Sequence, residues 1–345
     1  EIEEGVSAPI AKVEELPSKE EVEAHNASHV PYRSWCPHCV KGQLRAGAHR
    51  KQNNREHKVP TVSLDYFYFA KAEVEDESGP TSIALVDDKT GMLGSAVLKQ
   101  KGIEEWSVRV VKKLIDMLGH RKVIVKNDNE PAIMALRNEV KSMSDVEIVP
   151  EQPPAYDSRT SGKAENAVQR IEGQFRTLRD ALETRLQERL ESGHPAIEWL
   201  VMHTSDTINR YRVGPDGRTA YQRWKGKSFK RVVPEIAEKV MHLRAGSLKE
   251  QGRGKGASRW SEGHFGGIKN ETGELIIGTH EGTVKGRDFK RIADVGQRWS
   301  AESLKKIKGV PRKPNPEVED GNIYVKVKLP QDATPLTTRF TGASE

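Results

Sequence analysis

The 345-residue sequence contains no run of eighteen apolar residues, and no basic segment precedes an apolar one near its start. We therefore expect a soluble, intracellular protein without a membrane span. Only two cysteines are present, Cys36 and Cys39, so a disulfide framework is excluded, and their C-x-x-C spacing favours metal or redox chemistry. The sequence also lacks a G-x-S-x-G elbow and any internal repeat, which removes the support for serine-hydrolase chemistry and for a repeat architecture.

Charge is abundant but unevenly distributed. Charged residues make up 31% of the chain and hydrophobic residues 35%, with a formal net charge of +6. Residues 216–313 contain 23 Lys and Arg against 11 Asp and Glu, whereas residues 1–23 contain eight Glu and two Lys. A basic C-terminal third suits a polyphosphate partner, because each cation bound to a phosphate releases counterions. A solvated, soluble surface explains the same charge equally well.

Three acidic residues occupy positions that suit a metal site. Asp65 lies inside the apolar run at 59–69, where a carboxylate is costly unless something compensates it. Asp128 ends a short apolar run, and Glu165 begins a long amphipathic segment. Carboxylates on strands and a helix suit Mg²⁺ or Mn²⁺, and two such ions promote attack on a phosphodiester. The plain alternative is three unrelated, exposed acids.

A second cluster has the spacing His25-x₃-His29-x₆-Cys36-x₂-Cys39. Two imidazoles and two thiolates form a tetrahedral Zn²⁺ set, and histidines at i and i+4 share one face of a helix. His38 is a possible substitute ligand. The alternative is a redox or idle C-x-x-C with unrelated histidines.

Apolar periodicity predicts an α/β layer structure followed by a small barrel. Three antiparallel strands precede a helix, a strand, a helix, a strand and two long helices, expected at 59–69, 81–91, 92–102, 102–119, 122–128, 130–143, 146–157, 163–190 and 195–212. Asp87 and Asp88 fall in a turn, and we interpret them as hairpin residues. Glycine-separated runs at 231–298 predict a β-barrel of about five strands, and 322–329 is one further possible strand.

The acidic trio resembles the catalytic core of retroviral and retrotransposon integrases. Sixty-two residues separate Asp65 from Asp128 and 36 separate Asp128 from Glu165, within the letters SLDYF, KNDNEP and GKAEN. Retroviral members usually leave thirty-five residues in the second gap and have Asn-Gly after the second Asp, so the chain departs slightly in both. The histidine–cysteine cluster resembles the HHCC module that precedes this core, although its gap of six is shorter than usual.

This resemblance implies an RNase H-like five-stranded mixed sheet, preceded by a small zinc-binding module and followed by a small SH3-like β-barrel. It implies metal-dependent 3′-end processing and strand transfer of element DNA, double-stranded DNA as the partner, a homo-multimer, and action in the nucleus after a cytoplasmic stage. Asp65, Asp128 and Glu165 become the catalytic metal ligands. The expected DNA contacts are Lys163, Gln169, Arg176, Arg253, Lys255 and Arg259.

The modules expected from these patterns divide the chain as follows: an acidic linker at 1–23, the zinc module at 24–45, a linker at 46–58, the catalytic core at 59–215, the basic barrel at 228–299 and a linker or disordered tail at 300–345. A start at Glu1 and a polar end suit a segment of a polyprotein, or a trimmed chain. Two other hypotheses remain open: a domesticated or decayed DNA-binding protein without activity, and a related RNase H-fold nuclease or transposase.

Overall fold

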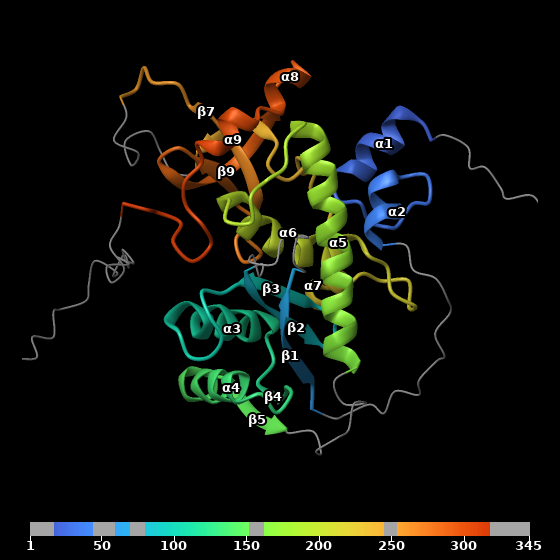
Figure 1. The fold of residues 1–345 in the computed structure, drawn as a ribbon, viewed down its shortest axis with the longest axis vertical. Helices are drawn as coiled ribbons and strands as arrows, with labels where there is room; N and C mark the ends of the chain where they lie inside the picture. The colour runs from blue at the N-terminus through green and yellow to red at the C-terminus, as the bar shows by residue number, and fades with distance from the viewer. Residues whose placement is uncertain (1–16, 44–58, 70–79, 152–161, 245–253, 318–345) are drawn as a thin grey trace, which may run out of the picture.

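The computed structural model describes residues 17–43, 59–69, 80–151, 162–244 and 254–317 (Figure 1). Within these ranges a pair of short helices precedes an α/β core, which is followed by a small barrel. The first two parts contain α1 (Lys19–Asn26), α2 (Pro37–Gln43), β1 (Thr61–Tyr68), β2 (Thr81–Asp87), β3 (Leu93–Val97), α3 (Glu105–Leu118), β4 (Lys122–Lys126), α4 (Pro131–Met143), β5 (Glu147–Glu151), α5 (Gly162–Leu186), α6 (Pro195–Tyr211) and α7 (Ala220–Lys225). No helix in the described ranges is both long and apolar enough to cross a bilayer.

The core sheet has five strands in the order β3-β2-β1-β4-β5. The first three strands pair antiparallel, whereas β4 joins β1 in parallel and β5 joins β4 in parallel. The predicted mixed five-stranded sheet is therefore confirmed. Because β1, β3 and β4 run in the same direction, their C-terminal ends meet at one edge of the sheet.

Alternation along β1 divides its side chains between two helical layers. Val62, Leu64 and Tyr66 pack into a core cluster with α3 and α4. Phe67 points the other way, into a cluster with Ala167 and other residues of α5 and α6. The sheet is thus covered on both faces, and α5 lies along the second face. Each fully buried aliphatic side chain contributes roughly 1.5–3 kcal/mol to this packing.

Local sequence explains where α3 and α4 begin and end. Glu104 and Ser107 form a reciprocal capping box at the start of α3, and Gly119 ends it in the left-handed conformation that glycine tolerates. Pro131 occupies the first turn of α4, where its missing N–H costs nothing. These short connections place the loop after β4 directly before α4.

Helix α2 packs on the second half of α5, and α1 lies beside it (Figure 1). Gly42 of α2 lies so close to α5 that a Cβ there would collide with Thr177. Gln43 donates a 2.6 Å hydrogen bond to Gln174, which in turn donates to the carbonyl of Ser28. Helix α1 begins at Lys19, so the expected acidic linker at 1–23 is wrong for its last residues, because the Ser18–Glu21 capping box starts the helix earlier.

The barrel is closed by four strands, not the five we expected. They are β6 (Lys239–Arg244), β7 (Trp260–Ile268), β8 (Leu275–Thr279) and β9 (Gly282–Arg291). Register shifts in β6 and β7 bend the strands sharply enough for four to close. The possible strand at 322–329 lies outside the described residues.

Part of the segment expected to be a linker is folded. Residues 300–317 include α9 (Ala301–Lys305), and α8 (Val295–Arg298) precedes them. Leu304 and Ile307 are buried with α5 and α6, and Trp199 of α6 donates a 3.0 Å hydrogen bond to the carbonyl of Gly309. Apolar contacts, the ion pair of Arg312 with Glu198 and a backbone bridge to Thr279 hold this polar segment, whose composition alone indicated a linker.

Candidate active site and metal centre

The pairing of β1 with β4 places two acidic residues side by side. The strands are parallel, with Ser63 opposite Lys126. Continuing this register by two residues sets Asp65 opposite Asp128, just beyond the end of β4. Side chains alternate along a strand and neighbouring strands lie about 4.8 Å apart, so both carboxylates reach the same face at the same height.

The loop that carries Asp128 is anchored on its other side. Asn127 is buried and accepts a 2.9 Å hydrogen bond from Arg137 of α4. The backbone N–H of Glu130 lies 3.4 Å from a carboxylate oxygen of Asp128. Because Asn127 points towards α4, alternation directs Asp128 towards the face that α5 covers.

Glu165 belongs to the first turn of α5 and is exposed. Its neighbours Ala164 and Ala167 are buried, and Ala167 packs beneath the helix in the cluster that contains Phe67 of β1. Gln169, one turn later, donates a 3.2 Å hydrogen bond to the Glu165 carboxylate. The third acid therefore comes from a rigid helix that lies on the same face as Asp65 and Asp128.

Electrostatics link these acids. Burial and the carboxylate of Asp128 raise the pKa of Asp65 to about 6, with smaller contributions from Glu130 and Glu165. Several negative groups therefore act on one carboxyl, which favours a proton or a cation at that position. In the part of the chain that the structure describes, one compact set of potential metal ligands is already assembled, and it is not the acidic trio.

The compact set consists of His25, His29, Cys36 and Cys39. One ligand atom from each lies within 4.8 Å of the others, and all four residues are buried. Cys36 Sγ is 3.5 Å from His29 Nδ1, and Cys39 Sγ is 3.3 Å from His25 Nε2. Zinc–ligand bonds of about 2.0–2.3 Å separate tetrahedral ligands by roughly 3.5 Å, so the donors and their spacing fit zinc.

Two of the ligands have the protonation state that a metal needs. A hydrogen bond from Cys39 holds the pKa of Cys36 well below its usual range and raises the pKa of Cys39 itself, and burial lowers the pKa of His29. A thiolate and a neutral imidazole are the forms that bind zinc. The predicted shared helical face is wrong, because α1 ends at Asn26 and His29 follows it with a φ of 52°. A turn after the helix brings His29 to the cluster.

His38 has a different role from the substitute ligand that we considered. Its Nδ1 forms a hydrogen bond with a carboxylate oxygen of Asp180 on α5. Lys41 Nζ lies 3.5 Å from the other oxygen of the same carboxylate. His38 therefore joins the cluster to the long helix instead of entering the ligand set.

Five of the six residues expected to contact DNA lie in the described part of the chain, three on α5 and two before β7. Lys163 forms a 2.6 Å ion pair with Asp88, and the exposed Arg176 lies 3.7 Å from Glu172. Gln169 and Arg176 share the face of α5 that carries Glu165. Lys255 and Arg259 are exposed before β7, and Arg253 lies outside the described residues.

Comparison with known proteins gives only loose structural likenesses. No family model matches the chain, and no curated protein matches its sequence. One similar structure is a simian T-cell lymphotropic virus intasome in complex with PP2A regulatory subunit B56 gamma, at 14% identity and a TM-score of 0.38, covering 74% of this chain and 87% of that one. Two others are integrase catalytic core domains. That of BIV has 18% identity and a TM-score of 0.31, and the match covers 48% of this chain and 93% of that one. That of HTLV-2 in complex with magnesium has 15% identity and a TM-score of 0.34, and the match covers 49% of this chain and 99% of that one.

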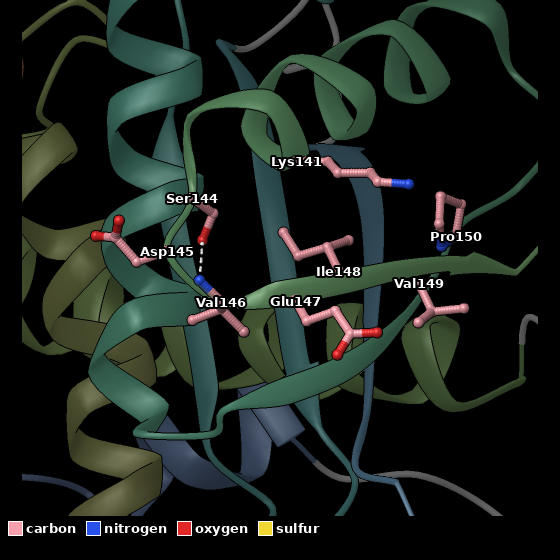
Figure 2. A pocket seen from close by; sticks show the side chains of 8 residues that line it. All are labelled: Lys141, Ser144, Asp145, Val146, Glu147, Ile148, Val149 and Pro150. Carbon is pink, nitrogen blue, oxygen red and sulfur yellow. Dashed lines mark hydrogen bonds between the residues drawn. The ribbon is translucent and has the colours of Figure 1, made fainter.

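A surface depression of about 410 Å³ lies beside the edge strand β5 (Figure 2). It is lined by Lys141 and residues 144–150, from the end of α4 to β5. The hydroxyl of Ser144 accepts a 3.2 Å hydrogen bond from the N–H of Val146 and so closes the turn into the strand. None of the three acids lines this depression, so it is separate from the candidate active site.

Sequence reasoning missed the side chains that border the acids at the edge of the sheet. Lys101, in the loop after β3, forms a 2.7 Å ion pair with Glu130. The only sequence signal was Glu130 itself, which stands where the resemblance leads one to expect glycine. Asp87 is buried and hydrogen-bonded to Thr90, as the predicted hairpin turn requires.

Proposed function

We propose that the chain is a retroelement integrase, a polynucleotidyl transferase that depends on divalent metal. In this proposal Asp65, Asp128 and Glu165 hold Mg²⁺ or Mn²⁺. The observation that carries it is the parallel register of β1 and β4, which sets Asp65 opposite Asp128 on the face that α5 covers. Bound ions would neutralise phosphate charge and activate the attacking hydroxyl or water.

The chain's own residues then have distinct tasks. Asp65 and Asp128 project from neighbouring strands and hold the first ligand positions, while Glu165 completes the set from α5. Gln169 orients the Glu165 carboxylate through its hydrogen bond. The raised pKa of Asp65 fits this role, because a cation relieves the repulsion from Asp128 that burial intensifies.

The other modules support DNA binding in this proposal. The histidine–cysteine cluster binds Zn²⁺ and orders α1 and α2. The four-stranded barrel is SH3-like and, with the exposed Lys255 and Arg259, holds double-stranded DNA. A homo-multimer brings two element ends to one target in the nucleus.

The direct test compares Glu165→Gln with the wild type on labelled duplex DNA in Mg²⁺ or Mn²⁺. We expect metal-dependent end trimming and joining that falls roughly a thousandfold in the variant, as when one charge-stabilising group is removed. Glu172→Gln is a matched control, since Glu172 lies two turns further along α5 and contacts only the surface Arg176 among the ion pairs of the described residues.

The other outcomes separate the alternatives. DNA binding without any metal-dependent product in the wild type would favour a non-catalytic DNA-binding protein. Products that persist in Glu165→Gln would place the reaction at another site. Cleavage without joining would favour the nuclease alternative.

A further inference from the structure

Two tyrosines of β1 face the side of the sheet opposite to Asp65. Tyr66 is buried against the α3 layer, and Tyr68, the last residue of the strand, is 43% exposed. The ammonium of Lys101 lies 5.2 Å from the centre of the Tyr66 ring and 5.5 Å from that of Tyr68. We call Tyr66, Tyr68, Lys101 and Glu130 the tyrosine–lysine cluster. It borders the edge of the sheet where β1, β3 and β4 end.

The cluster is built into the same loops as the acids. Lys101 Nζ lies 2.7 and 2.8 Å from the two carboxylate oxygens of Glu130, only two residues after Asp128. The N–H of Gly102 donates a 3.0 Å hydrogen bond to the Tyr66 hydroxyl, which fixes the loop after β3. Glu130 and Asp128 both act on the pKa of Tyr66, so the cluster and the acids lie within electrostatic reach.

Stability alone does not account for this arrangement. The side chain of Lys101 is 32% exposed and that of Glu130 is 30% exposed. An ion pair with that exposure contributes little to folding. Glu130 accepts two hydrogen bonds from the ammonium and the Tyr68 hydroxyl accepts another, so a phosphate at Lys101 would take the place of one of these acceptors. An exposed cation beside an exposed aromatic face is a combination that binds a nucleotide, through its phosphate and its sugar or base.

We propose that Lys101 and Tyr68 form a subsite for the DNA nucleotide next to the phosphodiester that the acids hold. Lys101 Nζ binds the phosphate of that nucleotide, and the Tyr68 ring contacts its sugar or base. Glu130 keeps the ammonium at the edge of the sheet when DNA is absent. The subsite rests on the proposed function and adds to it a residue pair that selects the position of the strand.

The experiment measures binding of a set of duplexes in which one phosphate at a time is replaced by a neutral methylphosphonate. Binding is measured with Ca²⁺, so that it does not depend on turnover. We expect the wild type to lose roughly tenfold in affinity at one particular position. Lys101→Met should bind unmodified duplex more weakly, show no further loss at that position, and reduce the salt slope by about 0.9, the value for one phosphate contact.

The controls separate this role from a structural one. Lys112→Met removes a comparable ion pair, 2.6 Å from Asp116 with a side chain 26% exposed, and should keep the wild-type profile. Lys101→Arg should restore the position-specific loss, and Tyr68→Phe should bind like the wild type while Tyr68→Ala binds more weakly. Thermal unfolding of each variant checks that the fold is retained.

Two outcomes would overturn the subsite. One is a Lys101→Met profile with the same position-specific loss as the wild type, and the other is absence of DNA binding by the wild type itself. Because this readout needs no catalysis, a chain that binds DNA at the subsite but makes no product would leave the subsite standing and contradict the integrase proposal alone.

Discussion

The histidine–cysteine cluster and the acidic trio are both candidate metal centres, yet the chain builds them in opposite ways. Four buried ligands of the first centre already lie within 4.8 Å of one another. The acids of the second come from strand β1, the loop after β4 and helix α5, and Glu165 remains exposed. A structural ion takes all its ligands from the protein, whereas a catalytic ion must leave positions open for the substrate.

Ligand chemistry explains the contrast. A neutral imidazole does not repel a thiolate or a thiol, so these ligands can be packed together before a metal arrives. Carboxylates are charged at neutral pH, and each one near Asp65 raises the pKa of that group. The carboxylates of the acidic site therefore repel one another until a divalent cation binds.

The largest expected effect comes from removing zinc. Helices α1 and α2 have eight and seven residues, too short to be stable in isolation, so the cluster and the packing of α2 on α5 together hold them. Cys39→Ser, or a zinc chelator, should unfold this module with an apparent loss on the order of 10 kcal/mol in its own folding free energy. Hydrogen exchange of α2 and of the facing part of α5, together with the zinc content, measures the change.

Removal of Mg²⁺ is the matching experiment, because it should leave the hydrogen-exchange rates of α1 and α2 unchanged. Unaltered protection of α2 after complete zinc loss would contradict the distinction between a structural centre and a catalytic one.

A smaller effect is expected at His203, a buried imidazole without a metal. It lies on α6 against Phe265 of the barrel, with ring centres 5.7 Å apart, and neither ring nitrogen has a hydrogen-bond partner among the described residues. Burial lowers the pKa of His203 to about 3. Because the unfolded chain titrates near pH 6.5, it binds more protons below that pH, and stability falls as pH falls from about 6.5 towards 3.

His203→Leu should remove this dependence. The wild type should lose about 2 kcal/mol more than the variant between pH 7 and pH 5, as followed by denaturant unfolding. The surface His280, with a side chain 76% exposed, offers the control substitution. Equal pH profiles of the wild type and His203→Leu would show that the imidazole already has a proton-accepting partner in solution.

Much of the core could be predicted from the sequence because its signals are local. Apolar runs marked β1, β2 and β3, and Gly119 marked the end of α3. Asp65 could be singled out because burying a carboxylate inside an apolar strand costs folding free energy unless something compensates it. Its position opposite Asp128, however, depends on the pairing of distant strands, which no local pattern specifies.

Contacts between distant polar residues could not be predicted. His38 and Asp180 are separated by 142 positions, and Lys101 meets Glu130 only because the ends of parallel strands converge. Such side chains look like ordinary surface residues in the sequence. Closure of the barrel by four strands depends on a bend in β7. The folding of residues 300–317 depends on a few apolar contacts, which the overall composition of the segment does not reveal.

The smallest expected effect sharpens the comparison at the acidic site itself. Asp65→Asn removes a carboxylate whose pKa lies near 6, so it should stabilise the metal-free protein by about 1 kcal/mol at pH 8 after allowance for solvent screening. The sign follows from the raised pKa: ionisation of Asp65 costs folding free energy above pH 6, and the advantage of asparagine vanishes below about pH 4, where both states are protonated.

Asp128→Asn relieves the same repulsion from the other strand. The two substitutions together should therefore stabilise the protein by less than the sum of the single effects, and denaturant unfolding of the four proteins measures the coupling. Excess Mg²⁺ should stabilise the wild type and neither variant, because only paired carboxylates form the ligand set. Strict additivity, or destabilisation by Asp65→Asn at pH 8, would mean that the two carboxylates do not share a site, and the contrast with the zinc cluster would then lose its basis.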